Sequence, residues 1–241
     1  MWKILGGMVT VNSIKRIWTR LRLRPIRVFC FHHVSDVFEP ETMWECDWMQ
    51  TEVFKKKVLT LKEKYTFISL EEAYAHIAND SFRVNNFAVL TSDDGWTSLE
   101  NILPWLAEEK IPVTLFLNPL YMDGKHFQSR DSEKFLTKEK VADLTERYEP
   151  FITIASHGWS HEDCLKMSKE SFEESVLKSE EYLMNMKGKV PFYAFTFGRH
   201  TIKQLKFLNQ QSLVSVLMDG MMNYDDVSCV HRECIDNGRK A

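Results

Sequence analysis

The sequence predicts an α/β fold in which parallel β-strands alternate with helices, and two observations support this class. From residue 26 onward, short apolar runs alternate with segments whose apolar residues recur at helical spacing, over about seven repeats. The connections are short, and no stretch rich in glycine, proline or serine divides the repeats. Such a pattern favours a barrel-like or an open α/β sheet, with functional residues at the carboxyl ends of the strands.

The first half of the chain contains the clearest signals. Strands are expected at residues 26–31, 66–70, 87–91 and 111–117, and helices around 54–61, 71–77 and 99–106. The third helix should begin with a capping box, because Thr97 is followed three residues later by Glu100. A strand, a helix and a strand joined this tightly imply a parallel pair with a right-handed crossover.

The second half repeats the pattern. Helices are expected at residues 138–147, 170–186 and 203–209, because their apolar residues recur every three to four positions. Each helix precedes a β-rich run, which predicts strands at 151–155, 190–197 and 213–218. The methionines at 218, 221 and 222 are expected in the core.

Length and composition bound the class of protein. At 241 residues the chain can bury a sizeable core, and its apolar and charged fractions of 44% and 27% are those of a globular protein. A net charge of −3 argues against a nucleic-acid partner. The five cysteines are odd in number and include no Cys-x-x-Cys, which indicates free thiols in a reducing compartment.

The N-terminal residues 1–24 form a basic arm. No acidic residue precedes Asp36, and Ile14, Ile17, Trp18 and Leu21 fall on one helical face. The chain has no apolar run of about 20 residues and no recognisable signal peptide. Two interpretations stay open: a helix lying on an anionic membrane, or a helix packed on the domain with a solvated basic face. We expect a cytoplasmic protein, with the arm able to attach it to the inner face of the membrane.

Two adjacent carboxylates, Asp93 and Asp94, follow directly after a predicted strand. Like charges side by side are costly unless a cation lies near them. A second segment provides ligands for such a cation, because His157 and His161 follow another predicted strand and are four residues apart. One helical turn would place both imidazoles on the same side. One carboxylate and two imidazoles make a three-ligand metal site, and the other carboxylate can act as a base.

Each motif alone has an ordinary structural explanation. Asp-Asp-Gly is typical of a turn, and paired histidines are more often structural than metal-binding. Because both motifs fall at predicted strand ends, the metal interpretation is favoured. A metal held there can polarise a carbonyl group and acidify a bound water. The residues therefore indicate a metal-assisted hydrolase of an amide or ester.

Together these motifs resemble the polysaccharide deacetylase family, the NodB homology domain of carbohydrate esterase family 4. Thr91-Ser92-Asp93-Asp94-Gly95 is similar to its Thr-Phe-Asp-Asp-Gly motif, and His157 to His161 is similar to its His-(Ser/Thr)-x-x-His motif, with Gly158 at the hydroxyl position. Residues 31–34, 111–116 and 194–198 resemble further family segments. The resemblance covers residues from about 26 to 235 and implies a distorted (β/α)7 barrel, here residues 25–241.

The resemblance also implies roles for individual residues. Asp93 would be the general base, and Asp94, His157 and His161 would bind a divalent metal, usually Zn²⁺. The implied reaction removes an acetyl group from an N-acetylated, or less often O-acetylated, sugar of a polysaccharide or glycan intermediate, one that could be lipid-linked. The metal would bind the acetyl carbonyl and the water that Asp93 deprotonates.

The proton donor is harder to assign by resemblance. The family's late histidine has no clear match, so His231 is our first candidate for the acid and His32 our second. His32, Trp96 and Phe197 are predicted to contact the substrate.

The arginine that tunes the base in many relatives has no counterpart, because Ala194 and Thr196 occupy the corresponding positions. This departure and the unclear acid keep one alternative open, a catalytically silent glycan-binding module. A metal-dependent hydrolase of a non-sugar amide is a second alternative.

Overall fold

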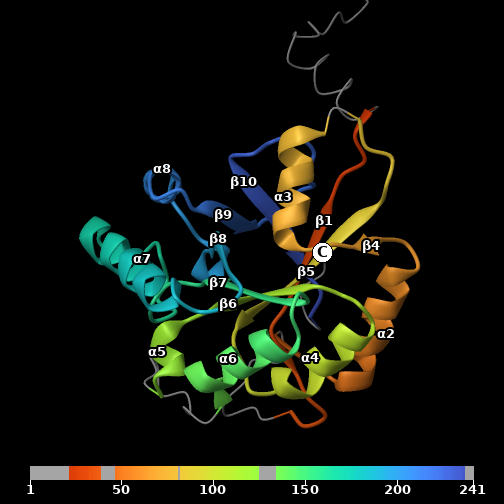
Figure 1. Cartoon of the computed structure of the whole chain (residues 1–241). Coiled ribbons are helices and arrows are strands. Elements are labelled where there is room, and N and C mark those ends of the chain that lie inside the picture. Colours follow the sequence, from red (N-terminus) through yellow and green to blue (C-terminus); the bar gives the residue numbers. More distant parts are fainter. Residues whose placement is uncertain (1–21, 39–46, 81, 125–133, 237–241) are drawn as a thin grey trace, which may run out of the picture.

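The computed structural model describes residues 22–38, 47–80, 82–124 and 134–236, and in this part of the chain a parallel barrel is the central feature (Figure 1). The strands are β1 (Arg27–Phe31), β2 (His33–Val34), β3 (Trp48–Met49), β4 (Thr66–Phe67), β5 (Phe87–Asp94), β6 (Val113–Leu117), β7 (Ile152–Ser156), β8 (Lys189–Ala194), β9 (Val214–Met218) and β10 (Cys229–Cys234). Neighbours pair in the order β1-β10-β9-β8-β7-β6-β5-β4, and β1 also pairs with β5. The β1–β5 pairing closes a ring of seven parallel strands, and β4 adds to one end of β5. The predicted distorted (β/α)7 barrel of the NodB type is therefore confirmed.

Helices surround this ring (Figure 1). They are α2 (Thr51–Lys62), α3 (Leu70–Asn79), α4 (Leu99–Glu108), α5 (Pro119–Met122), α6 (Lys138–Arg147), α7 (Lys169–Leu183) and α8 (Ile202–Gln210), with a 3₁₀ turn, η3, at Thr196–Gly198. Every strand and helix predicted from residue 26 onward overlaps one of these elements. Among the helices of the described residues, none is long and apolar enough to cross a bilayer.

The apolar core is divided by the barrel wall. Alternate residues of each strand point to opposite faces, so one set fills the barrel and the other packs beneath the helices. The interior set includes Val28, Val89 and Val230, together with residues of α3. Two outer clusters lie beneath α2, α4 and α6, and beneath α7 and α8. The interior face of β5 that carries Val89 continues to Asp93, which places a charge at the top of an apolar column.

The end of the barrel opposite the strand carboxyl ends receives the start of the described chain. Leu23 bridges to Arg83, and the backbone N–H of Arg24 donates to the carbonyl oxygen of Arg83 at 2.8 Å. Residues 1–21 of the predicted basic arm, residues 1–24, lie outside the described residues. The last three residues of the arm therefore lie against the domain.

Four local predictions differ from the structure. The cap residue of α4 is Ser98, without a side-chain cap, because the Thr97 hydroxyl donates to the carbonyl oxygen of Lys134 instead. The segment from His157 to His161 is a loop, with no helical turn. The strand β10 was not predicted. Of the three methionines expected in the core, those at 221 and 222 are exposed.

Candidate active site

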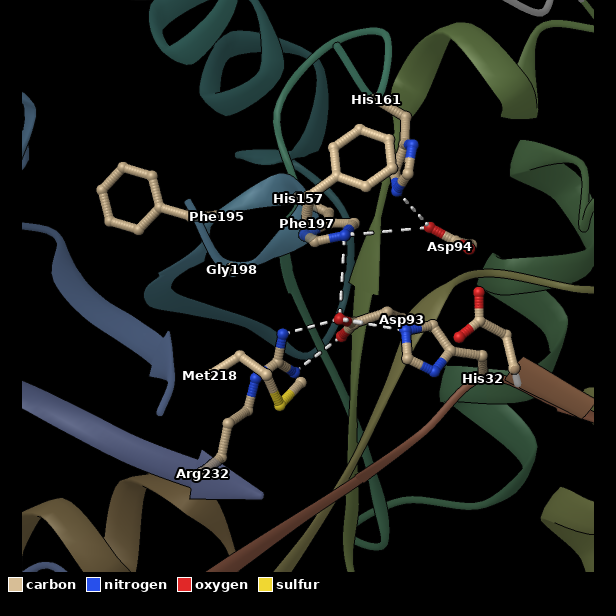
Figure 2. Close-up of a pocket in the computed structure, with 11 residues that line it drawn as sticks. His32, Asp93, Asp94, His157, His161, Phe195, Phe197, Gly198, Met218 and Arg232 are labelled. Atoms are coloured by element: carbon tan, nitrogen blue, oxygen red, sulfur yellow. Dashed lines mark hydrogen bonds and ion pairs between the residues drawn. The ribbon is translucent and has the colours of Figure 1, made fainter. Parts of the chain in front are cut away.

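The carboxyl ends of the barrel strands surround a pocket (Figure 2). Its lining residues are His32, Asp47, Asp93, Asp94, His157, His161, Phe195, Phe197, Gly198, Met218 and Arg232. Most of these charged and imidazole side chains are buried. Burial strengthens their mutual electrostatic interactions, because water screens them less than at the surface. Their arrangement therefore determines which groups are charged.

Asp94, His157 and His161 converge as one group of metal-ligand atoms. One ligand atom from each lies within 4.8 Å of the other two. Nε2 of His161 lies 3.1 Å from Oδ1 of Asp94, and Nε2 of His157 lies 3.8 Å from the same oxygen. All three residues are buried, and Figure 2 shows their side chains pointing toward one another.

The donor set fits a divalent metal. Two imidazoles and one carboxylate are the ligands of many catalytic zinc sites. Nδ1 of His157 donates to the carbonyl oxygen of Ala194 at 2.9 Å, which leaves Nε2 as the ligand atom. Burial lowers the pKa of His157 to about 4, so the ring is in the neutral form that binds metals. These residues could therefore hold a metal.

Asp93 is held by an arginine from the other end of the chain. Arg232 Nη1 and Nη2 donate to the two carboxylate oxygens at 2.7 and 2.6 Å, and the guanidinium lies over the ring of Phe116 at 5.1 Å. Burial by itself would raise the pKa of Asp93. The positive charge and hydrogen bonds of Arg232, together with the charges of His157 and His32, outweigh the effect of burial, and the pKa falls to about 2. Asp93 is therefore an ionised, fixed carboxylate at neutral pH.

His32 lies on the other side of Asp93 and has its own carboxylate. Nε2 of His32 is 3.8 Å from Oδ2 of Asp93, while Nδ1 is 2.6 Å from Oδ2 of Asp236. Burial opposes protonation of the ring. The neighbouring Cys30 and the hydrogen bond with Asp236 nevertheless raise the pKa of His32 above its ordinary value. The pocket thus holds an ionised carboxylate and a histidine that favours its proton.

Backbone strain is concentrated at this site. Asp94, His161 and Phe197 have φ angles of 70°, 56° and 57°, in the left-handed region that non-glycine residues rarely adopt. Each costs about 1–3 kcal/mol and persists only where its surroundings fix it. Gly158 lies between the histidines at φ +78°, where a Cβ would approach the hydroxyl oxygen of Tyr193 to 2.9 Å. This contact explains glycine at the position where the family pattern has a hydroxyl residue.

Two of the three residues predicted to contact substrate, His32 and Phe197, line the pocket. Trp96 does not. Its buried indole packs with Tyr121 and Phe135, and Nε1 donates to Oδ2 of Asp94 at 3.3 Å. Trp96 therefore packs beside Asp94, outside the pocket lining.

The prediction of His231 as the acid does not agree with the geometry. His231 is not among the pocket-lining residues, and its Nδ1 lies 2.8 Å from Oδ2 of Asp219. Neighbouring strand residues point to opposite faces. Since Arg232 points into the barrel, the imidazole of His231 points out of it.

Arg232 and Asp236, the charged partners of Asp93 and His32, are site residues that the sequence did not reveal. Arg232 is 139 positions from Asp93, and Asp236 is 204 positions from His32. Arg232 lies on β10, and Asp236 lies just after it. The β10 sequence Cys-Val-His-Arg-Glu-Cys has only one strongly apolar residue, so it was not recognised as a strand. The available signal was the alternation within β10, which places Val230, Arg232 and Cys234 on one face.

The described residues thus form a closed parallel barrel whose strand carboxyl ends carry a buried carboxylate, Asp93, and a group of side chains that could hold a metal. The sequence profile of the family described as polysaccharide deacetylase matches residues 83–214, more than half of the chain. The chain belongs to this family, and it is a hydrolase of amide C–N bonds in sugars. Its substrate class is acetylated polysaccharide.

Solved structures show the same fold. A de-N-acetylase from Aggregatibacter actinomycetemcomitans has a TM-score of 0.75 and 16% identity, over 90% of this chain and 97% of that one. The Streptococcus pyogenes deacetylase PplD in complex with acetate has a TM-score of 0.73 and 18% identity, over 89% and 93%. IcaB from Ammonifex degensii has a TM-score of 0.69 and 16% identity, over 88% and 91%. Among curated proteins, none matches the chain.

Proposed function

We propose that the protein is a Zn²⁺-dependent deacetylase that removes the acetyl group from an N-acetylated sugar of a polysaccharide or glycan intermediate. One observation carries the proposal. Asp93, held ionised by Arg232, lies beside the three converging donors, with its Oδ2 3.7 Å from Nε2 of His157. A base next to a metal-ligand set is the minimum arrangement for hydrolysis by an activated water.

Asp94, His157 and His161 would hold the metal. When bound, the ion supplies Lewis acidity that polarises the acetyl carbonyl and lowers the pKa of water. The protein keeps the ligands ready for it through two contacts already described, the Ala194 carbonyl on His157 and the Trp96 indole on Asp94. Each contact fixes the direction of one ligand's lone pair.

The chain's own residues move the protons. Asp93 accepts a proton from the attacking water as the water oxygen bonds to the acetyl carbon. His32, protonated and held by Asp236, then donates its Nε2 proton to the sugar nitrogen as the C–N bond breaks. Acetate and the free amine leave. Because Asp93 and His32 lie on adjacent sides of the pocket, base and acid can act on opposite ends of the scissile amide.

The silent-module alternative depended on the missing arginine. Arg232 occupies the place of that arginine beside the base, although it comes from a different strand. This contact favours turnover over binding alone. The non-sugar amide alternative has no observation in its favour among the described residues.

Membrane association is a separate proposal. The basic arm, residues 1–24, would attach the protein to the cytoplasmic face of an anionic membrane. Liposome co-sedimentation should decrease when residues 1–21 are removed. Unchanged co-sedimentation would count against attachment through the arm.

The deacetylase proposal is tested by acetate release from N-acetylglucosamine oligomers, with metal content measured on the same sample. We expect one equivalent of zinc, loss of activity on chelation, and recovery when zinc is returned. His157→Ala should lose both zinc and activity. Full activity in the chelated protein would contradict the metal-dependent mechanism.

A further inference from the structure

A second group of metal-ligand side chains lies beside the pocket and shares His32 with its lining. His32 joins β1 to β2, and Cys234 and Asp236 lie at the end of β10. Ligand atoms of these three residues lie within 4.8 Å of one another, and all three are buried. His32 also lines the pocket, so an ion that enters the pocket can reach the group.

The carboxylate of Asp236 is the centre of this group. Its Oδ2 lies 2.6 Å from Nδ1 of His32 and accepts a hydrogen bond from Sγ of Cys234 at 3.1 Å. Asp236 also accepts the backbone N–H of His32 at 3.4 Å. These two contacts with His32 are sufficient to orient an acid. The thiol of Cys234 is therefore an additional donor that the proposed reaction does not use.

We propose that His32, Cys234 and Asp236 form a second, inhibitory site for a thiophilic divalent cation of the class of Zn²⁺ and Cd²⁺. One nitrogen, one sulfur and one oxygen donor match the ligands that such borderline and soft ions prefer. The site is distinct from the set formed by Asp94 and the two loop histidines, because it shares no residue with that set and contains a thiol.

The exchange of protons for the ion is balanced. The cation replaces the proton on Nδ1 of the His32 imidazolium and the thiol proton of Cys234, and both protons go to solvent. One divalent charge replaces two protons, so the net charge of the buried group does not change. This equality matters because an uncompensated charge at a buried site is costly.

The consequence for the reaction rests on the proposed function. A His32 ring bound to a cation through Nδ1 cannot take a second proton at that nitrogen. It therefore cannot become the imidazolium that gives a proton to the leaving nitrogen. Occupancy of the second site should stop turnover while the first metal stays bound.

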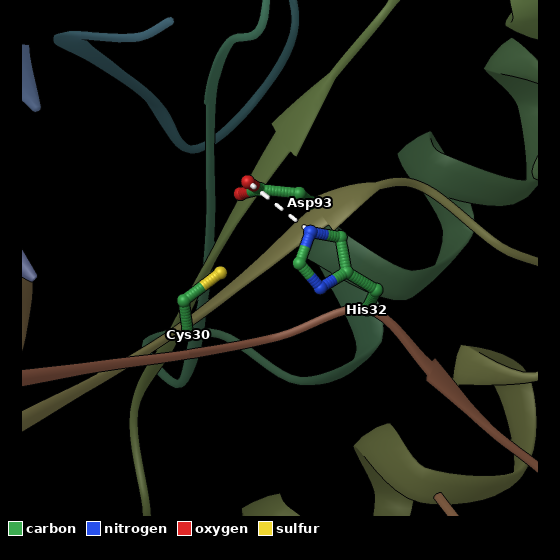
Figure 3. Close-up of side chains that lie close together, drawn as sticks. All are labelled: Cys30, His32 and Asp93. Atoms are coloured by element: carbon green, nitrogen blue, oxygen red, sulfur yellow. Dashed lines mark ion pairs between the residues drawn. The ribbon is translucent and has the colours of Figure 1, made fainter. Parts of the chain in front are cut away.

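A neighbouring group, Cys30 with His32 and Asp93, is a poorer site (Figure 3). Nη1 of Arg232 lies 3.3 Å from Sγ of Cys30 and 2.7 Å from Oδ1 of Asp93. The guanidinium already neutralises Asp93 and would repel a cation in the same space. The contacts thus favour Cys234 over Cys30 as the thiol ligand.

Cadmium provides the test, because a cadmium–thiolate bond gives an ultraviolet charge-transfer band and the first site contains no thiol. Cd²⁺ is titrated into the zinc-loaded full-length chain, into Cys234→Ala and into Cys229→Ala. Cys229 is the matched control: it is also buried on β10, and its Sγ lies 3.5 Å from Nε2 of His231. The wild type and Cys229→Ala should show the band and lose activity about a hundredfold, the contribution of a general acid. Cys234→Ala should show neither effect.

The band and the activity separate the two proposals. An absent band in the wild type, or an equal band and equal inhibition in Cys234→Ala, would overturn the second site. If Cys234→Ala does not fold, Cys234→Ser preserves a donor to Asp236 and should lose the band in the same way. A wild type that shows the Cys234-dependent band but releases no acetate even before cadmium is added would support the second site and contradict the proposed function.

Discussion

The metal-ligand side and the proton-transfer side of the pocket are assembled differently. Asp94 ends β5, and His157 and His161 lie in one loop after β7, so this side comes from two short motifs near the middle of the chain. The proton-transfer side joins Asp93 to residues near both ends of the chain.

The two sides differ in how far apart their contacting residues lie in the sequence. Each motif of the metal side lies at the end of a predicted strand. These strands, β5 and β7, are parallel and separated only by β6, so their carboxyl ends lie at the same edge of the sheet. Arg232 reaches Asp93, and Asp236 reaches His32, only because β1 pairs with both β5 and β10. Closure of the barrel therefore builds the proton-transfer side. Changes on that side should affect both catalysis and folding, whereas changes on the metal side should affect mainly metal binding.

The largest expected effect is at Asp93. Asp93→Asn should lower kcat/KM by about 10⁴-fold, because the general base is lost, while zinc content is unchanged. It should also lower the free energy of unfolding by about 3–5 kcal/mol, because Arg232 is left buried without a counter-charge. Acetate release, metal analysis and denaturant unfolding measure the three quantities. In Asp93→Asn combined with Arg232→Met, stability should recover and activity should not.

Arg232→Met should have the next largest effect, and its signature is a pH profile. Arg232 holds the pKa of Asp93 at about 2, below the unfolded value of about 3.9. A lowered pKa stabilises the fold above pH ~4, and this stabilisation is lost as the pH falls toward about 2. Without the guanidinium, burial raises the pKa, so the acid limb of kcat/KM should move to higher pH. An unmoved acid limb would show that Arg232 does not tune the base.

His32→Gln should lower kcat by about a hundredfold, the loss of a general acid, with zinc content unchanged. His231→Gln is the matched control and should stay near wild-type activity, because its ring faces Asp219 outside the barrel. The reverse ranking would restore His231 as the acid.

The pH dependence of kcat tests the contact between His32 and Asp236. The pKa of His32 is raised, so its protonated form persists to higher pH than that of an ordinary histidine. Protonated His32 stabilises the fold. This contribution is complete below the pKa of about 6.5 that His32 has in the unfolded chain, and it is lost as the pH rises through the higher pKa of His32 in the folded protein. Asp236→Asn removes one cause of the increase and should move the alkaline limb of the kcat profile to lower pH.

The smallest effect is expected at Trp96, on the metal side. Trp96→Phe keeps the aromatic packing with Tyr121 and Phe135 but removes the donor to Asp94. Zinc affinity should fall by about 10–100-fold, with kcat of the zinc-saturated enzyme little changed. Trp105→Phe is the control and should leave zinc affinity unchanged, because Trp105 packs against the core cluster beside Phe54 and does not line the pocket. Equal affinities in all three proteins would mean that the indole does not position Asp94.

The elements that the sequence predicts correctly include those with strong apolar periodicity. The run before Asp93 and the helix at Lys138–Arg147 were located from spacing alone, and both were found. β10 was missed because its interior face carries an arginine and a cysteine at Arg232 and Cys234, where a buried strand is expected to be apolar. The polar residue that made β10 hard to recognise, Arg232, is the one that contacts Asp93 in the site.

Loop geometry was the second limit. Spacing predicted a helical turn from His157 to His161, yet both imidazoles reach the Asp94 carboxylate from a loop. That path requires positive φ at Gly158 and His161, which the tertiary contacts of the loop impose.

The sequence by itself determined the repeating β/α pattern, the paired carboxylates and the two histidines, because each depends on residues close together in the chain. Only the tertiary structure decided which groups surround those residues. Closing the barrel placed Arg232 beside Asp93 and Asp236 beside His32, and it turned His231 outward. The physical reason is that the charge state of a buried group is set by its neighbours in space, and those neighbours come from strands more than a hundred residues apart.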